Sequence, residues 1–256
     1  MFSLFGDTEE LKPVRPEPPT APAEEDQLAL LQKEKELVGM YLSSHPLDKY
    51  RFELATFTNC PLGTLSDKIA ECDNKRTSAK VQVGGLVTAY KQLTTKTGKP
   101  YSRTTIEDFS GSYELSLFGK DHETFMSYLQ EVHQALFLEG EIGEKFRLKP
   151  EEVAAGKKAP FAFRLKKISL LGNVAEEKLK AFAITVSTPM LSETFRRNLV
   201  KLVKANPGPI ELKLYFHDPG TGYKIEFTSK KFHVGISTEF LADLKALGIP
   251  YKAIQK

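Results

Sequence analysis

The sequence predicts an α+β protein: a five-stranded OB-fold β-barrel, preceded by a helical segment and followed by a small α/β domain. Three observations favour this fold class. Residues 80–171 contain five stretches with the pattern of strands, one helical pattern lies between the third and fourth of them, and Gly84–Gly85 interrupt the first. The first strand of an OB-fold bends to pair on two sides, and glycine in a strand often marks such a bend.

The chain of 256 residues divides into four expected parts. Residues 1–27 are expected to be a flexible tether, because residues 7–27 hold five prolines among acids and few large apolar groups. A helix is expected to start after Asp26 and to end near Ser43–Ser44, because His45 precedes Pro46. The other three parts are a helical lead-in over 28–78, the OB-fold over 79–172 and an α/β docking domain over 173–256.

Hydrophobic periodicity and turn residues place the elements within these parts. Residues 47–78 are expected to form a short second helix with connecting turns. The OB-fold strands are expected at 80–93, 101–108, 112–118, 135–142 and 161–171, with a helix over 121–131. The last domain is expected to have strands at 181–187, 210–217, 223–229 and 232–236, and helices over 191–205 and 238–247.

Several functional classes are disfavoured by composition. No apolar run reaches the roughly 18 residues of a membrane span, and the first residues do not have the pattern of a secretory signal. Cys60 and Cys72 belong to no CxxC motif, so we expect reduced thiols in a cytoplasmic protein. No catalytic residue, metal site or cofactor is expected. The five histidines do not have the spacing of metal ligands; they are His45, His122, His133, His217 and His233.

Charge is unevenly distributed along the chain. The net charge is +3, but residues 1–27 carry −5 and the remainder therefore carries +8. A basic body favours an anionic partner.

A cluster of cations marks the hairpin between the first two expected OB-fold strands. Lys91, Lys96, Lys99 and Arg103 lie at or beside this turn with no acidic residue among them. Strands 2 and 3 and the loops between strands 1–2 and 4–5 are the usual oligonucleotide surface of an OB-fold. Strand alternation puts Ser102, Thr104 and Ile106 toward the core, and it exposes Tyr101, Arg103, Thr105 and Phe118.

Basic residues also occur in the expected loop between strands 4 and 5. Arg147, Lys157 and Lys158 are nucleic-acid-binding candidates there, although Glu151 and Glu152 dilute their charge. Cations beside stackable side chains hold single strands without reading sequence. The alternative is that these loops are merely solvated lysine-rich segments.

The acidic pair Glu107–Asp108 precedes the Ser110–Gly111 turn. Two neighbouring carboxylates can bind a metal ion. Next to a Ser-Gly turn we expect them instead to order the hairpin through hydrogen bonds between side chain and backbone.

Two segments together resemble the C-terminal part of the bacterial replicative DNA polymerase III alpha subunit. The first is "EKELVGMYLSSHPLDKY", in which Gly39, Tyr41, Leu42, His45, Pro46 and Leu47 match the family's Gly-x-Tyr-Leu-x-x-His-Pro-Leu stretch. The second is "GGLVTAYKQLTTKTGKPYSRTTIEDFSGSYELSLF". Its matches to the family's OB domain are Gly85-Leu86-Val87, Thr95 to Lys99, Glu107-Asp108 with Gly111, and Leu117-Phe118.

This resemblance implies that the chain is a fragment of a DNA-directed DNA polymerase. In the family the polymerase domain and its catalytic aspartates lie N-terminal to this region. We therefore expect the chain alone to have no nucleotidyl-transfer activity, since that chemistry needs clustered carboxylates to position two metal ions. Where the family often has an apolar or aromatic group, this sequence has Arg103.

The resemblance also implies two protein partners in DNA replication. Ser3, Leu4 and Phe5 match a sliding-clamp-binding motif that the family carries just before the helix, although Met1 stands where the motif has Gln. The family's last domain contacts the tau subunit of the clamp loader, and no residue can be assigned to that contact from the sequence.

The sequence therefore predicts a non-catalytic region of a replicative polymerase that binds single-stranded DNA through its OB-fold and docks to the sliding clamp and clamp loader. Two other functions remain open. One is a pure protein-docking scaffold, and the other is the tRNA anticodon-binding OB module of a synthetase. The His45-Pro46-Leu47 segment and the apolar Ser3-Leu4-Phe5 group disfavour the synthetase module.

Overall fold

The structure is a computed structural model that describes residues 27–39, 41–146, 148–149, 151–152 and 156–256. The chain forms two compact units, of which the first ends at His45 and the second runs from Pro46 to Lys256. Each unit is described by itself below. The expected tether and the Ser3-Leu4-Phe5 motif lie outside the described residues.

The first unit contains helix α1, Gln27–Val38, which ends earlier than the sequence predicts. Gly39 follows with a left-handed φ of +83°. The Glu34 carboxylate then accepts hydrogen bonds from the backbone N–H groups of Leu42 and Ser43, both at 3.0 Å. A hydrogen bond from the Ser43 hydroxyl, and after it these two backbone bonds, lower the pKa of Glu34. The expected helix end at Ser43–Ser44 is wrong because this loop folds back onto the helix.

The second unit begins with two helices where one was expected. After the short 3-10 turn Asp48–Tyr50, α2 spans Arg51–Phe57 and α3 spans Leu62–Lys75. Leu47, of the His-Pro-Leu stretch, is fully buried in the core. The second helix was missed because "NCPLGTLSDKI" contains Pro and Gly. In α3, however, Pro61 precedes the first turn and Gly63 lies within it.

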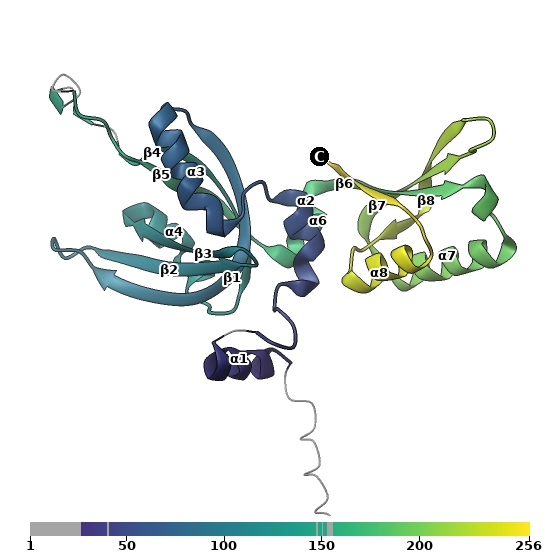
Figure 1. Ribbon diagram of the computed structural model, residues 1–256, viewed down its shortest axis with the longest axis horizontal. Helices are drawn as coiled ribbons and strands as arrows, with labels where there is room; N and C mark the ends of the chain where they lie inside the picture. Colours follow the sequence, from purple (N-terminus) through teal and green to yellow (C-terminus); the bar gives the residue numbers. More distant parts are fainter. Residues whose placement is uncertain (1–26, 40, 147, 150, 153–155) are drawn as a thin grey trace, which may run out of the picture. The chain divides into compact units, whose positions relative to one another are not determined.

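A five-stranded antiparallel sheet follows, with the order β3-β2-β1-β4-β5. Helix α4, Gly119–Leu129, connects β3 to β4 as the OB-fold requires. The fold class predicted from the sequence is confirmed, and in the described residues no ladder pairs β3 with β5 to close the barrel. The strands are β1 Ala79–Thr94, β2 Pro100–Asp108, β3 Gly111–Phe118, β4 Ala135–Glu144 and β5 Phe161–Leu170 (Figure 1).

Strand β1 bends to serve two partners. It pairs with β4 from Ala79 to Leu86 and with β2 from Leu86 to Thr94. A Cβ atom on Gly85 would lie 2.7 Å from Ile106 Cγ2, 2.7 Å from Leu62 Cδ1 and 2.8 Å from the Glu107 carbonyl oxygen. Gly85 therefore permits α3 and β2 to approach β1 closely. A bend or bulge was expected at Gly84–Gly85; β1 changes partner at the next residue, Leu86, and the register shift in the ladder with β2 lies between Val87 and Ala89.

The OB-fold core lies between this sheet and the helices α3 and α4. Leu62, Leu65 and Cys72 are the buried positions of α3, and Ile69 packs beside them at helical spacing. Cys60 and Cys72 are both buried and free. Helix α4 contributes Leu129, which is fully buried.

The C-terminal part forms a four-stranded sheet with the order β8-β7-β6-β9. Strands β6 and β7 are parallel and are connected through helix α7, whereas β8 and β9 are antiparallel to their neighbours. The two strands expected at 223–229 and 232–236 are one irregular strand, β8. The bounds are β6 Leu179–Ser187, α7 Glu193–Ala205, β7 Pro207–His217, β8 Lys224–Val234, α8 Thr238–Ala246 and β9 Tyr251–Gln255.

Helices α7 and α8 are capped at their N-termini in the same way, by a serine hydroxyl. The hydroxyl of Ser192 accepts from the N–H of Phe195 at 3.1 Å, and that of Ser237 accepts from Phe240 at 3.0 Å. Each cap satisfies one of the free N–H groups of a helix N-terminus. Both helices then pack on the sheet, as Figure 1 shows, through Leu202, Val203, Phe240 and Leu244 against Phe182, Ile184, Ile210 and Leu212.

Two further elements were not anticipated from the sequence. Helix α6, Leu171–Lys178, spans the expected boundary at 172/173, and β9 pairs antiparallel with β6. Both were missed because they are short, and because Gly172 and Pro250 read as loop signals. Leu171 and Val174 of α6 are fully buried in a core that also includes Leu86.

A carboxyl group is buried where α2 contacts the C-terminal part. Glu53 is 6% exposed, and no described group pairs with its Oε2. Burial raises its pKa from an ordinary value of 4.5 to about 7. The side chain lines a pocket of about 490 Å³ with residues of α8 and β9, among them Leu241 and Tyr251.

Substituting Gly85 tests the close approach at the bend of β1. Gly85→Ala should lower the free energy of unfolding by about 1–3 kcal/mol, because its methyl group meets backbone and two core side chains. Gly143→Ala is the matched control, since its Cβ would meet only Ser78 Oγ at 3.6 Å. Urea denaturation of both variants measures this difference, and equal stabilities would contradict it.

The raised pKa of Glu53 leads us to expect that stability depends on pH. Its pKa is higher in the folded protein, so the folded state binds the extra proton between about pH 4.5 and 7. This contribution is fully present below pH 4.5 and is lost as the pH rises through 7, by on the order of 2–3 kcal/mol. Glu53→Gln should remove it. The unfolding free energies of the two proteins should therefore diverge from pH 4.5 to 8, and parallel curves would refute the assignment.

Candidate nucleic-acid interface

The turn between β1 and β2 is built by Thr95. Its N–H donates to the Lys99 carbonyl at 2.8 Å, and its hydroxyl accepts from the Lys99 N–H at 3.0 Å. Gly98 takes the left-handed φ of +80° that the turn requires. The chain "TKTGK" therefore forms a defined turn. It presents the exposed side chains of Lys96 and Lys99 at the tip of the hairpin.

Two aromatic rings lie next to this turn on the outer face of the sheet. Tyr101 of β2 pairs directly with Phe118 of β3, and Leu93 of β1 is on the other side of Tyr101. The two rings are stacked, with centroids 4.8 Å apart and planes at 11°. Phe118 is 47% exposed. Together they form an apolar platform that can extend its stack to a base.

The next row on the same face is basic. Lys91 pairs across the sheet with Arg103, which places two like charges side by side. Glu114 offsets them, because its Oε1 lies 3.1 Å from Arg103 Nε. The sequence analysis did not anticipate this ion pair. It leaves Arg103 less available to a ligand than the lysines.

The three lysines of the site differ from Arg103 in their surroundings. In the described part of the chain no carboxylate lies within salt-bridge distance of Lys91, Lys96 or Lys99, and all three are exposed. Strand alternation on β2 is confirmed, since Ser102, Thr104 and Ile106 are buried beneath this face. The predicted residues Lys91, Lys96, Lys99, Tyr101, Arg103 and Phe118 are therefore brought together on one surface.

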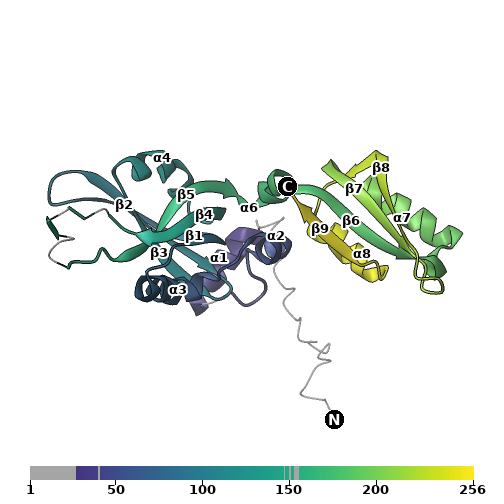
Figure 2. The same cartoon turned by 90° about the horizontal axis from the view of Figure 1, so that it is seen from above.

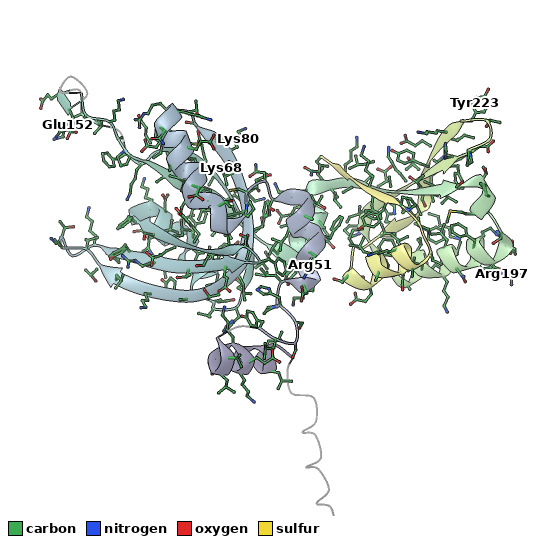
Figure 3. All side chains as sticks on the ribbon, viewed as in Figure 1. Arg51, Lys68, Lys80, Glu152, Arg197 and Tyr223 are labelled. Atoms are coloured by element: carbon green, nitrogen blue, oxygen red, sulfur yellow. The ribbon has the colours of Figure 1, made fainter. Side chains whose placement is uncertain are left out.

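The loop between β4 and β5 is less well suited to an anion. Lys157 lies 3.5 Å from the carboxylate of Glu152, and Lys158 is exposed beside Arg76 and Asp73. Arg147 lies outside the described residues. Figures 1 and 2 both show this loop and the β1–β2 turn extending from the same end of the sheet, and Figure 3 marks Glu152 on the former.

Asp108 has the structural role expected for it. Its Oδ1 accepts from the N–H groups of Ser110 and Gly111 at 2.7 and 3.1 Å, and its Oδ2 accepts from Leu62 N at 2.8 Å. One carboxylate thus orders the β2–β3 turn and caps the N-terminus of α3. Within the residues that the structure describes, no group of three His, Cys, Asp or Glu side chains could hold a metal ion.

The pairing of the two aromatic residues could have been predicted from the position of the β2–β3 turn. The turn pairs Asp108 with Gly111, so residues whose numbers share that sum face each other, and Tyr101 and Phe118 are such a pair. The same rule pairs Thr105 with Glu114. The contact between Arg103 and Glu114 is diagonal and follows only from side-chain length.

An antiparallel sheet in this strand order, with a helix between its third and fourth strands, defines the class of OB-fold domains. Sequence comparison then finds similar proteins. Residues 182–252 match the family described as "DNA polymerase III alpha subunit, C-terminal domain". The chain is 28% identical over 250 residues to a DNA polymerase III subunit alpha from Thermus aquaticus and 27% identical over 201 residues to one from Haemophilus influenzae.

These alignments confirm the resemblance inferred from the motifs. They cover 97% and 78% of this chain. The chain spans only 18% and 16% of the length of the two relatives. Over most of its length the chain is thus similar to a part of DNA polymerase III alpha subunits, and its residues 182–252 match their C-terminal domain.

Structural matches are weaker. Rim1, a mitochondrial single-stranded DNA binding protein from S. cerevisiae, aligns over 36% of this chain and 93% of its own, with 14% identity and a TM-score of 0.26. A putative aspartyl-tRNA synthetase from Leishmania major aligns over 57% of this chain and 26% of its own, with 15% identity and a TM-score of 0.28. Scores this low do not distinguish between the two.

The described helices were also compared with the length and apolarity of a membrane span. None of them is both long and apolar enough to cross a bilayer.

Proposed function

We propose that the OB-fold binds single-stranded DNA, as part of a replicative DNA polymerase that acts in the cytoplasm. The observation that carries this proposal is the stacked pair Tyr101–Phe118 next to lysines that pair with no carboxylate of the described residues. Lysines neutralise phosphates and release counterions, whereas an aromatic platform stacks any base. Single strands offer both groups, and a duplex offers only the phosphates.

The finer docking roles are part of the same proposal. Ser3, Leu4 and Phe5 would contact the sliding clamp, and residues 173–256 would contact the tau subunit of the clamp loader. Both rest on the resemblance to the polymerase family. Nucleotide polymerisation would belong to other parts of a longer protein, because the matched region is 16–18% of the length of relatives such as that of Thermus aquaticus.

Removing the tip lysines should reduce the salt dependence of binding. For a single-stranded oligonucleotide, log K falls with log salt by about 0.7 per phosphate contacted, so Lys96→Ala with Lys99→Ala should flatten the slope by up to about 1.4. Fluorescence anisotropy across a salt series measures this slope. Lys68→Ala with Lys80→Ala removes the same charge from a site away from the turn and should leave the slope unchanged (Figure 3).

The aromatic pair provides the complementary test with the same oligonucleotides. Tyr101→Ala should weaken binding by about 1–3 kcal/mol without changing the salt slope. The loss of binding free energy in the double variant Tyr101→Ala with Phe118→Ala should be smaller than the sum of the losses in the two single variants, because the two rings act together. A lysine variant with unchanged affinity and slope would support the protein-docking scaffold. A preference for tRNA stem-loops over single-stranded DNA would support the anticodon-binding module.

Leu4→Ala with Phe5→Ala should abolish binding to a bacterial sliding clamp. The wild-type interaction should already be weak, because Met1 stands where the motif has Gln. Surface plasmon resonance with immobilised clamp measures it. Leu11→Ala with Val14→Ala removes apolar side chains elsewhere in the same segment and should have no effect. Equal loss in the two variants would refute the motif assignment.

A further inference from the structure

The C-terminal part of the chain is more basic than the OB-fold. Residues 179–256 contain twelve Lys and Arg against six Asp and Glu, a net charge of +6. Residues 79–172 contain fourteen against eleven, a net charge of +3. The basic character of the body is therefore concentrated outside the OB-fold surface described above.

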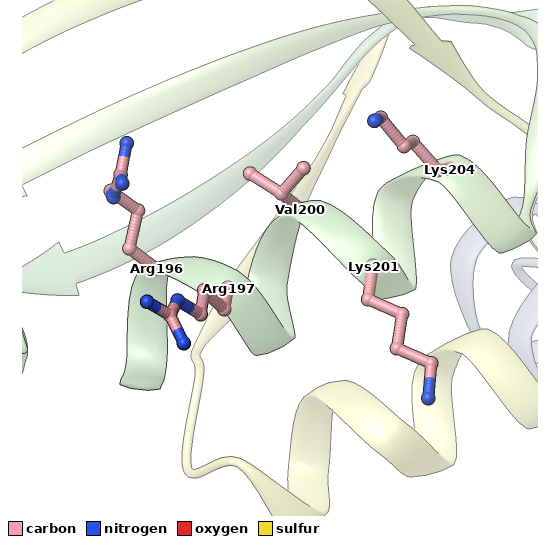
Figure 4. A pocket seen from close by; sticks show the side chains of 5 residues that line it. All are labelled: Arg196, Arg197, Val200, Lys201 and Lys204. Atoms are coloured by element: carbon pink, nitrogen blue, oxygen red, sulfur yellow. The ribbon is translucent and has the colours of Figure 1, made fainter. Parts of the chain in front are cut away.

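Four of these cations gather on helix α7. Its Leu202 and Val203 are buried in the core, with Phe195 and Leu199 packed beside them. The helical repeat of 3.6 residues then puts the basic side chains on the solvent side. They line a pocket of about 420 Å³ together with Val200. Figure 4 shows these side chains along the helix on either side of Val200; they are Arg196, Arg197, Lys201 and Lys204.

Acidic groups neutralise only part of this face. Glu193, in the first turn, contacts both Arg196 at 2.8 Å and Arg197 at 3.2 Å. Hydrogen bonds from Arg196 and then Arg197 lower the pKa of Glu193. Among the described residues no carboxylate pairs with Lys201 or Lys204. The face therefore keeps a net charge of +3.

The chemistry of this face favours phosphates over an acidic protein segment. Val200 is the one large apolar side chain among the pocket-lining residues, and no aromatic ring is present there. A protein partner usually needs an apolar anchor at the centre of its interface. The backbone of DNA instead offers a phosphate about every 3.4 Å along each strand, and Arg197 to Lys204 spans about 10 Å of helix.

We propose that the outer face of α7 is a second nucleic-acid contact, which binds the sugar–phosphate backbone of duplex and single-stranded DNA alike. It lacks the stacking platform of the OB-fold and so reads neither base identity nor strandedness. This contact does not depend on the OB-fold function. Either site can fail its test while the other passes.

The test is duplex binding by the full chain that carries Lys96→Ala and Lys99→Ala, so that the OB-fold contribution is reduced. The probe is a fluorescent blunt duplex of about 20 base pairs, titrated between about 50 and 200 mM salt. Adding Lys201→Gln and Lys204→Gln should flatten the slope of log K against log salt by up to about 1.8, because each duplex phosphate contact contributes about 0.9. Lys201→Arg with Lys204→Arg should preserve the slope.

The matched control is Lys245→Gln with Lys252→Gln, which removes the same charge from α8 and β9. It should leave the duplex slope unchanged. An unchanged slope in the α7 variant would overturn the proposal. An equal loss in the control would also overturn it, because only the net charge of the domain would then matter. Thermal unfolding of each variant verifies that the fold is intact.

Discussion

The arrangement of the OB-fold depends on one steric constraint, the close approach of other groups to Gly85. Strand β1 must exchange its β4 partner for its β2 partner near Leu86, and α3 must pack against it at the same place. Any side chain on Gly85 would collide with Leu62 of α3 and with Ile106 and the backbone of β2. With the glycine, β2 and β3 lie on one side of β1 and β4 and β5 lie on the other. That placement brings the basic turn and the aromatic pair to one face.

Asp108 connects this sheet to the helix that covers it. Its carboxylate bonds to both the β2–β3 turn and the N-terminus of α3. The turn in turn fixes the register of β3, and that register places Phe118 opposite Tyr101. The stack at one end of the hairpin is therefore set by polar contacts at the other end, seven ladder positions away along β2.

Most of the fold could be predicted from alternation, turn residues and caps, because these are local. The five OB-fold strands, α4, α7 and α8 were all expected within a few residues of their observed ends. The features that were missed depend on contacts outside the pattern of each element. The end of α1 at Val38 is followed by a loop that bonds to Glu34 through Leu42 and Ser43, and β9 pairs with an edge of β6.

The same distinction holds for the candidate site. Exposure of Arg103 and Phe118 followed from a two-residue period and was correct, whereas Tyr101 is half-buried. The partner of Arg103 depends on how far two long side chains reach across β3, which a single-strand pattern does not contain. The cations of α7 are scattered in the sequence at 196, 197, 201 and 204. They lie on one face only in the helical conformation.

The order of strands in the C-terminal sheet has a consequence for synthesis of the chain. Strand β6 is almost entirely buried, yet its antiparallel neighbour β9 comes some 70 positions later, at Tyr251–Gln255. While a ribosome is still making those last residues, one edge of β6 has unpaired backbone groups beside Phe182 and Ile184. Such edges pair readily with other chains. The interval between translation of β6 and of β9 is thus when the nascent protein is most exposed to aggregation.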